Sequence, residues 1–76
     1  MGIQITMEAA RINSGYSQKD AAKLFGVHYQ TLAKWEINNS KMPHDKIEMI
    51  SKIYNIPKSL IFFGDKNEFI RRLRRS

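Results

Sequence analysis

Apolar residues recur at helical spacing through most of the chain, and capping or turn residues separate the recurrent segments. The clearest segment is 44–54, where Ile47, Ile50, Ile53 and Tyr54 occupy positions i, i+3, i+6 and i+7 of one helix face. Shorter segments with the same period precede and follow it. The pattern predicts an all-α protein with five short helices, over residues 7–13, 18–25, 29–37, 44–54 and 58–63.

Two of these helices are joined by a sharp corner. Ser17 is a good N-cap for the first of them, and Asp20 stands three residues later in the arrangement of a capping box. Gly26 is expected to end this helix, because glycine adopts a left-handed backbone without a steric penalty. Val27 is then expected to fill the corner between the two helices.

A helical wheel divides the helix over 29–37 into two faces. Leu32 and Trp35 fall on one side, which we expect to face the core. The opposite side is polar and basic, with a small residue at its centre, and consists of Tyr29, Gln30, Ala33 and Lys34. A helix with such an outer face can approach DNA closely enough to contact base edges.

Five constrained positions of this stretch agree with one known motif. They provide an entry residue, a small residue between helices, a turn glycine and two core apolar residues, which are Gln18, Ala22, Gly26, Leu32 and Trp35, followed by Glu36. In this spacing the chain resembles the Cro and lambda-repressor type of helix-turn-helix protein, also called the XRE family. The resemblance covers roughly residues 5–64. It implies a compact five-helix Cro/lambda-repressor-like bundle.

The resemblance also implies that the helix over 29–37 enters the major groove of DNA by its first residues. Tyr29, Gln30 and Lys34 are the predicted base contacts, since a glutamine can bind adenine and a lysine can donate to guanine or to a phosphate. Gln18 opens the preceding helix at the family's phosphate-contacting position. The predicted contacts to the DNA backbone are Gln18, His28, Thr31, Asn38, Asn39 and Lys41.

Three positions depart from the family's pattern. His28 occupies an N-cap position where Ser or Thr is usual, and because imidazole is a weaker cap we expect it to contact a phosphate instead. Asn38 replaces the usual glycine, and both Asn38 and Asn39 tolerate left-handed backbone. Pro57 stands at the usual cap of the fifth helix.

Basic residues concentrate at the end of the chain. The net charge is +6, of which residues 65–76 contribute five basic and two acidic side chains, or +3, and residues 1–64 the other +3. We therefore expect a DNA-binding domain over 1–64 and a basic tail over 65–76. The tail can form a sixth short helix, because Phe69, Ile70 and Leu73 share one face. Our hypothesis is that this face packs at a dimer interface, and the alternative is a solvated basic tail that raises non-specific DNA affinity.

Two further segments carry structural expectations. The first five residues form either an extended arm, with Ile3 and Ile5 pointing the same way, or a frayed terminus. Tyr16 follows a Ser-Gly turn and is expected to pack between the first two helices with its hydroxyl in water.

Catalysis and metal binding have no support in the sequence. There is no cysteine, no glycine-rich phosphate loop and no nucleophile motif, and His28 and His44 have no partner at ligand spacing. We predict no enzymatic activity, no catalytic or metal-binding residue, no cofactor and no small-molecule ligand. The acidic residues are interpreted as helix-end or surface charges, each with a common structural role in the first turn of a helix or in an ion pair, namely Glu8, Asp20, Glu36, Asp45 and Glu48.

The compartment follows from further absences. The lack of cysteine fits a reducing cytoplasm, and neither a secretion signal nor an apolar run of about 20 residues is present. We expect a protein of the bacterial cytoplasm or nucleoid, with no membrane partner.

The leading functional hypothesis is a homodimeric transcriptional regulator of the Cro or repressor kind, from a phage, a prophage or a bacterium, that binds a palindromic double-stranded DNA operator. The chain is either a small Cro-like protein or a domain of a longer repressor. The alternatives are an antitoxin or other protein-binding module with the same fold, and a recombination or architectural DNA-binding protein.

Overall fold

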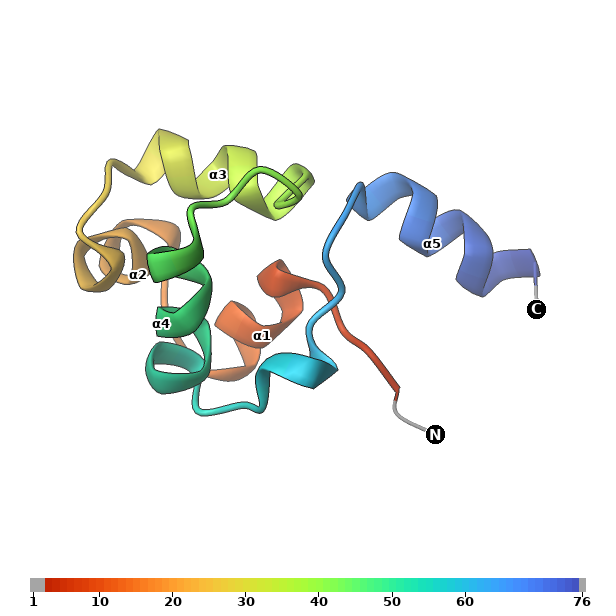
Figure 1. The fold of residues 1–76 in the computed structure, drawn as a ribbon, viewed down its shortest axis with the longest axis horizontal. Helices are drawn as coiled ribbons and strands as arrows, with labels where there is room; N and C mark the ends of the chain where they lie inside the picture. Colours follow the sequence, from red (N-terminus) through yellow and green to blue (C-terminus); the bar gives the residue numbers. More distant parts are fainter. Residues whose placement is uncertain (1–2, 76) are drawn as a thin grey trace.

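The computed structural model describes residues 3–75, and α-helices account for most of this range. The elements are α1 (Met7–Asn13), α2 (Gln18–Phe25), α3 (Tyr29–Ile37), α4 (His44–Tyr54), a 3-10 turn (Lys58–Leu60) and α5 (Lys66–Arg75). The first four helices form one bundle, and α5 extends from it at one end (Figure 1). The predicted all-α class with five helices and a helix-turn-helix is confirmed, although the fifth α-helix of the described residues is α5 rather than the predicted helix over 58–63.

The core lies where α1 to α4 converge. Phe25, Leu32 and Ile50 have no exposed surface. The Phe25 ring meets the ring of Trp35 edge-on at a centroid distance of 6.3 Å, and the ring of Tyr54 at 5.7 Å. Leu32 and Trp35 therefore turn toward the bundle, as the helical wheel predicts, although Trp35 is only partly buried.

The corner between α2 and α3 has the geometry that the sequence predicts. Gly26 is left-handed, with a φ of 74°, and its N–H donates to Lys23 and Ala22 carbonyls at the end of α2. Ala22 is buried at 2% exposure, and Val27 packs partly buried against the core. The ammonium of Lys46 in α4 donates to the Phe25 carbonyl at 2.8 Å, which satisfies one of the free carbonyls at the end of α2.

The segment before α1 is an extended arm in its described part. The Ile5 N–H donates to the Leu60 carbonyl at 2.8 Å, and the Phe62 N–H donates to the Ile5 carbonyl at 2.9 Å. Residues 1–2 of the expected arm lie outside the described residues. The predicted helix over 58–63 is shorter than expected, because only its first three residues form a 3-10 turn and the next ones pair with the arm.

Helix ends follow their local chemistry. The Ser17 hydroxyl accepts from the Asp20 N–H at 3.1 Å, as predicted, and Thr6 caps α1 in the same way through the Ala9 N–H. Asn55 ends α4 in a left-handed conformation, with a φ of 52°. These caps explain why such short helices begin and end where they do.

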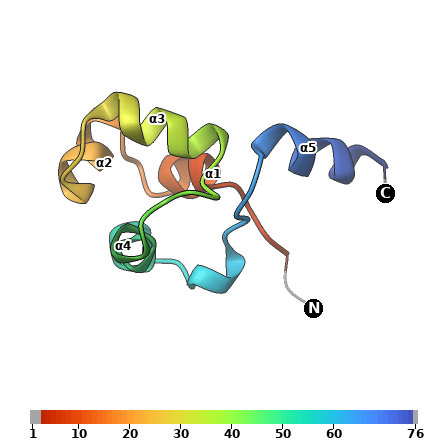
Figure 2. The same ribbon diagram turned by 45° about the horizontal axis from the view of Figure 1, so that its top comes forward.

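The expected tail helix exists and is α5. Its first turn is capped by the Asp65 carboxylate, which accepts from the N–H groups of Asn67 at 2.8 Å and Glu68 at 3.2 Å. Figures 1 and 2 both show that α5 starts beside the C-terminal end of α3 and continues away from the bundle. In both views α4 and the 3-10 turn lie on the opposite side of the molecule from α3.

Candidate nucleic-acid interface

The outer face of α3 is open to solvent along its whole length. Gln30 and Lys34 are exposed, Tyr29 is 39% exposed, and Ile37 at the end of the helix is 54% exposed. The residue between them, Ala33, is small enough to leave room for an approaching surface. The three predicted base-contacting residues therefore share one accessible strip, which is the geometric requirement for a helix that enters a DNA groove.

The start of α3 is built from stacked side chains. The His28 Nδ1 accepts from the Gln30 N–H at 3.2 Å, so this imidazole caps the helix and carries its proton on Nε2 in the neutral form. The His28 and Tyr29 rings lie 4.6 Å apart between centroids, and the Lys19 ammonium lies 5.4 Å from the centre of the Tyr29 ring. His28 thus acts as the cap of α3, whereas the sequence analysis expected it to contact a phosphate instead of capping the helix.

The ammonium of Lys19 is a functional candidate that the sequence analysis did not select. Lys19 is exposed on the first turn of α2 and adds a positive charge beside the exposed strip of α3. The signal was available, because Lys19 directly follows Gln18, the predicted phosphate contact.

A buried ion pair joins three helices beneath this surface. The Arg11 Nε donates to the Glu36 Oε2 at 2.6 Å, and Arg11 also donates to the Tyr16 carbonyl at 2.8 Å. The Gln18 amide donates to the Glu36 Oε1 at 2.9 Å. Glu36 is only 4% exposed, so of the interpretations given for it the ion pair at a helix end is found and the surface charge is not. Gln18 is half-buried, and the bond to Glu36 fixes its amide at the start of α2.

The loop after α3 divides its polar residues between surface and interior. Asn38 is exposed and extended, with a φ of −152°, so it does not use the left-handed backbone that asparagine tolerates. Its carboxamide oxygen accepts from the Ser40 N–H at 3.0 Å, which shapes the turn. Lys41 is exposed, whereas Thr31 on α3 itself is half-buried.

Asn39 is a structural residue rather than a surface one. It is 3% exposed, its amide donates to the Phe62 carbonyl at 3.2 Å, and its carboxamide oxygen accepts from the Gly64 N–H at 2.8 Å. The predicted contact between Asn39 and the DNA backbone is incompatible with this burial. Instead Asn39 joins the end of α3 to the segment that leads into α5.

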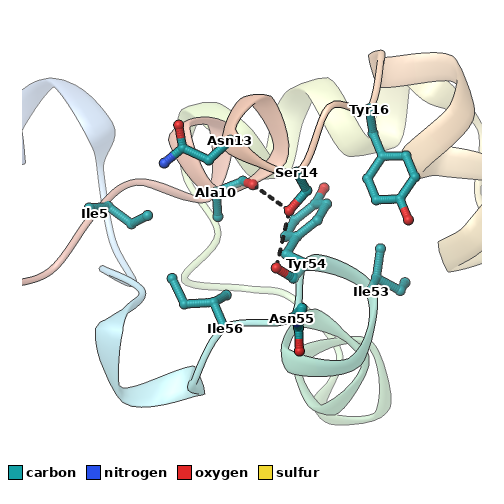
Figure 3. A pocket seen from close by; sticks show the side chains of 9 residues that line it. All are labelled: Ile5, Ala10, Asn13, Ser14, Tyr16, Ile53, Tyr54, Asn55 and Ile56. Carbon is teal, nitrogen blue, oxygen red and sulfur yellow. Dashed lines mark hydrogen bonds between the residues drawn. The ribbon is translucent and has the colours of Figure 1, made fainter.

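A separate hollow lies between the C-terminal ends of α1 and α4. It has a volume of about 490 Å³ and contains no residue of α3 and no charged residue among those that line it (Figure 3). The Ser14 hydroxyl, on the wall of this hollow, donates hydrogen bonds to the carbonyls of Ala10 and Tyr54.

The hydroxyl of Tyr54 is a buried titratable group. Burial, with the charge of Glu36 as a second cause, raises the pKa of the Tyr54 hydroxyl well above its usual range.

Two absences concern the described residues alone. Within 3–75, no three His, Asp or Glu side chains are grouped closely enough to hold a metal ion. No helix in that range combines the length and the apolar character needed to cross a membrane.

The α2–corner–α3 geometry and the exposed polar strip on α3 together define a helix-turn-helix DNA-binding domain. A sequence model of the family described as helix-turn-helix matches residues 7–61, which is most of the chain. The chain therefore belongs to the XRE-type helix-turn-helix family, whose members are DNA-binding regulators. Among curated proteins, none matches the chain.

Proposed function

We propose that the protein is a sequence-specific transcriptional regulator of the Cro or repressor kind, from a phage, a prophage or a bacterium. Its role is binding rather than catalysis, and α3 lies in the major groove of double-stranded DNA. The observation that supports this role is the accessible strip of Tyr29, Gln30 and Lys34 on a helix whose other side is locked into the core. We divide the chain into a DNA-binding domain over 1–64 and an appended basic element over 65–76.

Base recognition is assigned to the first half of α3. The exposed Gln30 carboxamide can form two hydrogen bonds with an adenine, and Lys34 can donate to a guanine one helical turn later. Tyr29 lies beside them, fixed by its stack with His28, and offers a hydroxyl and a flat apolar surface.

Backbone contacts surround this strip. Gln18 and the free N–H groups of the first turn of α2 are suited to a phosphate oxygen, and the bond to Glu36 positions the Gln18 amide before DNA arrives. Lys41 and Asn38, both exposed after α3, are assigned to the phosphates on the other side of the groove. The remaining proposed contacts are His28, whose Nε2–H is available, and Thr31. Asn39 is left out because of its burial.

We further propose that the active form is a homodimer on a palindromic operator. The support is the apolar side of α5, where Ile70 is half-buried and Leu73 is 59% exposed. Apolar surface of this kind at one end of a small domain is typical of protein contacts. Sedimentation of the full chain, and of a chain that ends at Gly64, measures this directly, and a truncated chain with an unchanged oligomeric state would contradict the α5 interface.

The test of sequence-specific binding begins with selection of bound sites from random duplexes, where we expect a palindrome. On the selected site, Gln30→Ala and Lys34→Ala should each weaken binding by about 1–3 kcal/mol. On random DNA, Gln30→Ala should cost much less, because it removes a base contact and no charge. Lys52 is an exposed residue of α4, and Lys52→Ala is the matched control for the removal of a lysine. Equal losses of Gln30→Ala on both kinds of DNA would reassign Gln30 to the backbone, and recovery of no preferred site would favour an architectural protein.

A further inference from the structure

Helix α5 begins next to the C-terminal end of α3, the proposed recognition helix. Asn38, which ends α3, pairs in antiparallel fashion with Asp65, which caps α5. The tail helix therefore begins where the recognition helix ends, and Figures 1 and 2 show it on the same side of the bundle as α3. A surface that binds α3 lies close to α5 as well.

Specific contacts of residues 66–72 hold α5 in this place. The Phe69 ring stacks on the Phe62 ring, with centroids 4.4 Å apart and an angle of 26° between planes. The Lys66 ammonium forms an ion pair with the Glu8 carboxylate of α1 at 3.2 Å. The Arg72 guanidinium lies 5.7 Å from the centre of the Phe62 ring. Contacts of Lys66, Phe69 and Arg72 thus dock α5 on the bundle, while residues 71–74 stay exposed.

This docking directs two arginines away from the bundle. At about 100° per residue, Arg71 lies about 160° and Arg74 about 140° around the helix from Phe69. Both side chains are exposed. Their Cβ atoms, three positions apart, are separated by about 5–6 Å. Two guanidinium groups at that spacing can reach neighbouring phosphates of one DNA strand.

We propose that α5 is a second DNA-binding element, in which Arg71 and Arg74 contact phosphates next to the bases that α3 contacts. The proposal rests on the DNA-binding function proposed above. An anionic membrane would use the apolar side of such a helix, but Phe69 on that side is packed against Phe62, and the exposed Leu73 is assigned above to the dimer interface. DNA requires only the exposed basic side, which leaves the docking intact.

The experiment compares two charge-matched double variants of the full chain. Arg71→Gln/Arg74→Gln removes the proposed contacts, and Lys52→Gln/Lys58→Gln removes two charges from α4 and the 3-10 turn, on the side opposite α3. Affinity for a random duplex of about 30 base pairs is measured from about 50 to 200 mM salt. Co-sedimentation with vesicles rich in anionic phospholipid is measured in parallel.

We expect the arginine variant to flatten the slope of log K against log salt by about 1.8, or 0.9 for each lost phosphate contact. Across this salt range the wild type should then lose about tenfold more affinity than the variant. The lysine variant should keep the wild-type slope. Equal flattening in both variants would reduce the effect to net charge and overturn the proposal, as would an unchanged slope in the arginine variant or a loss confined to vesicle binding.

Failure of the proposed function has a different signature. If the protein selects no preferred site, sequence-specific regulation fails, while a slope difference between the two variants still supports phosphate contacts by α5. If a preferred site is selected and Gln30→Ala weakens it, but the slopes of both variants match the wild type, only the role of α5 fails.

Discussion

Removal of the Glu36 carboxylate should threaten the fold of the whole domain, although Glu36 belongs to the recognition helix. Glu36→Ala leaves the Arg11 guanidinium buried without its counter-charge, in a site where the two side chains are 10% and 3% exposed. It also removes the acceptor of the Gln18 amide. Loss of one partner of a buried pair costs about 3–5 kcal/mol. A chain of 76 residues has about 4–11 kcal/mol of stability in total.

The measurement is urea denaturation followed by far-UV circular dichroism, with the fluorescence of Trp35 as a second probe. We expect Glu36→Ala to lower the free energy of unfolding by about 3–5 kcal/mol and the thermal midpoint by more than about 10 °C. The double variant Arg11→Met/Glu36→Leu should recover most of this stability, because an apolar pair of similar volume needs no desolvated charge.

That double variant also separates folding from DNA binding. It should fold but bind DNA more weakly than the wild type, because the Gln18 amide no longer has the partner that positions it. A Glu36→Ala protein within about 1 kcal/mol of the wild type would refute the reasoning, since it would show that water already stabilises the Arg11 charge. If the double variant is as unstable as Glu36→Ala, the lost stability comes from altered side-chain packing rather than from the unpaired charge of Arg11.

Four further substitutions separate structural roles from binding roles. Trp35→Ala should lower stability by about 2–4 kcal/mol, less than a fully buried aromatic residue, because Trp35 is only partly buried against Phe25; an unchanged urea midpoint would contradict its place at the core. Tyr54→Phe should equal or exceed the wild type by about 1 kcal/mol at neutral pH, since the buried hydroxyl has no partner within the described residues. The pKa of Tyr54 is raised in the folded state, so above the unfolded pKa of about 10 the unfolded chain loses its tyrosine proton more readily than the folded chain. The free energy of unfolding of the wild type should therefore fall as the pH rises above about 10. It should fall less steeply for Tyr54→Phe, which has no hydroxyl to titrate. Asn39→Ala should lower stability by about 1–3 kcal/mol and leave the salt dependence of DNA binding unchanged, whereas Lys41→Ala should change the salt slope and leave the urea midpoint unchanged.

The helices could be predicted because each is specified within its own segment. The apolar stripe from Ile47 to Tyr54 has the period of an α-helix and so predicts α4. Ser17 and Gly26 set the two ends of α2 through local hydrogen bonds and a left-handed backbone. The predicted helix over 58–63 fails for the opposite reason. The chain leaves the helical conformation at Ile61, because Ile61 forms a parallel β-bridge with Ile5. Ile5 lies some 56 positions away in the sequence, so no local pattern predicts this pairing.

Burial was the harder property to predict within the candidate site. The accessible strip of Gln30 and Lys34 follows from the wheel, and the same wheel places Glu36 only about 40° from Leu32, on the side that faces the core. For Asn39 no signal existed, since a loop residue has no helical phase and its partners, near Phe62, are distant in sequence. Its place directly after the helix over 29–37 favours a contact to the DNA backbone, whereas the structure buries it.

The confusion of structural with binding residues has a physical origin in this small domain. A recognition helix of nine residues cannot be held by apolar contacts alone, because its outer side must stay polar for DNA. Its second half is therefore fixed by hydrogen bonds, to Arg11 and Gln18 through Glu36 and to the segment before α5 through Asn39. The amides and charges that hold the helix are the same residue types that contact bases and phosphates. Residue type thus cannot separate the two roles, and the exposed fraction of each side chain decides between them.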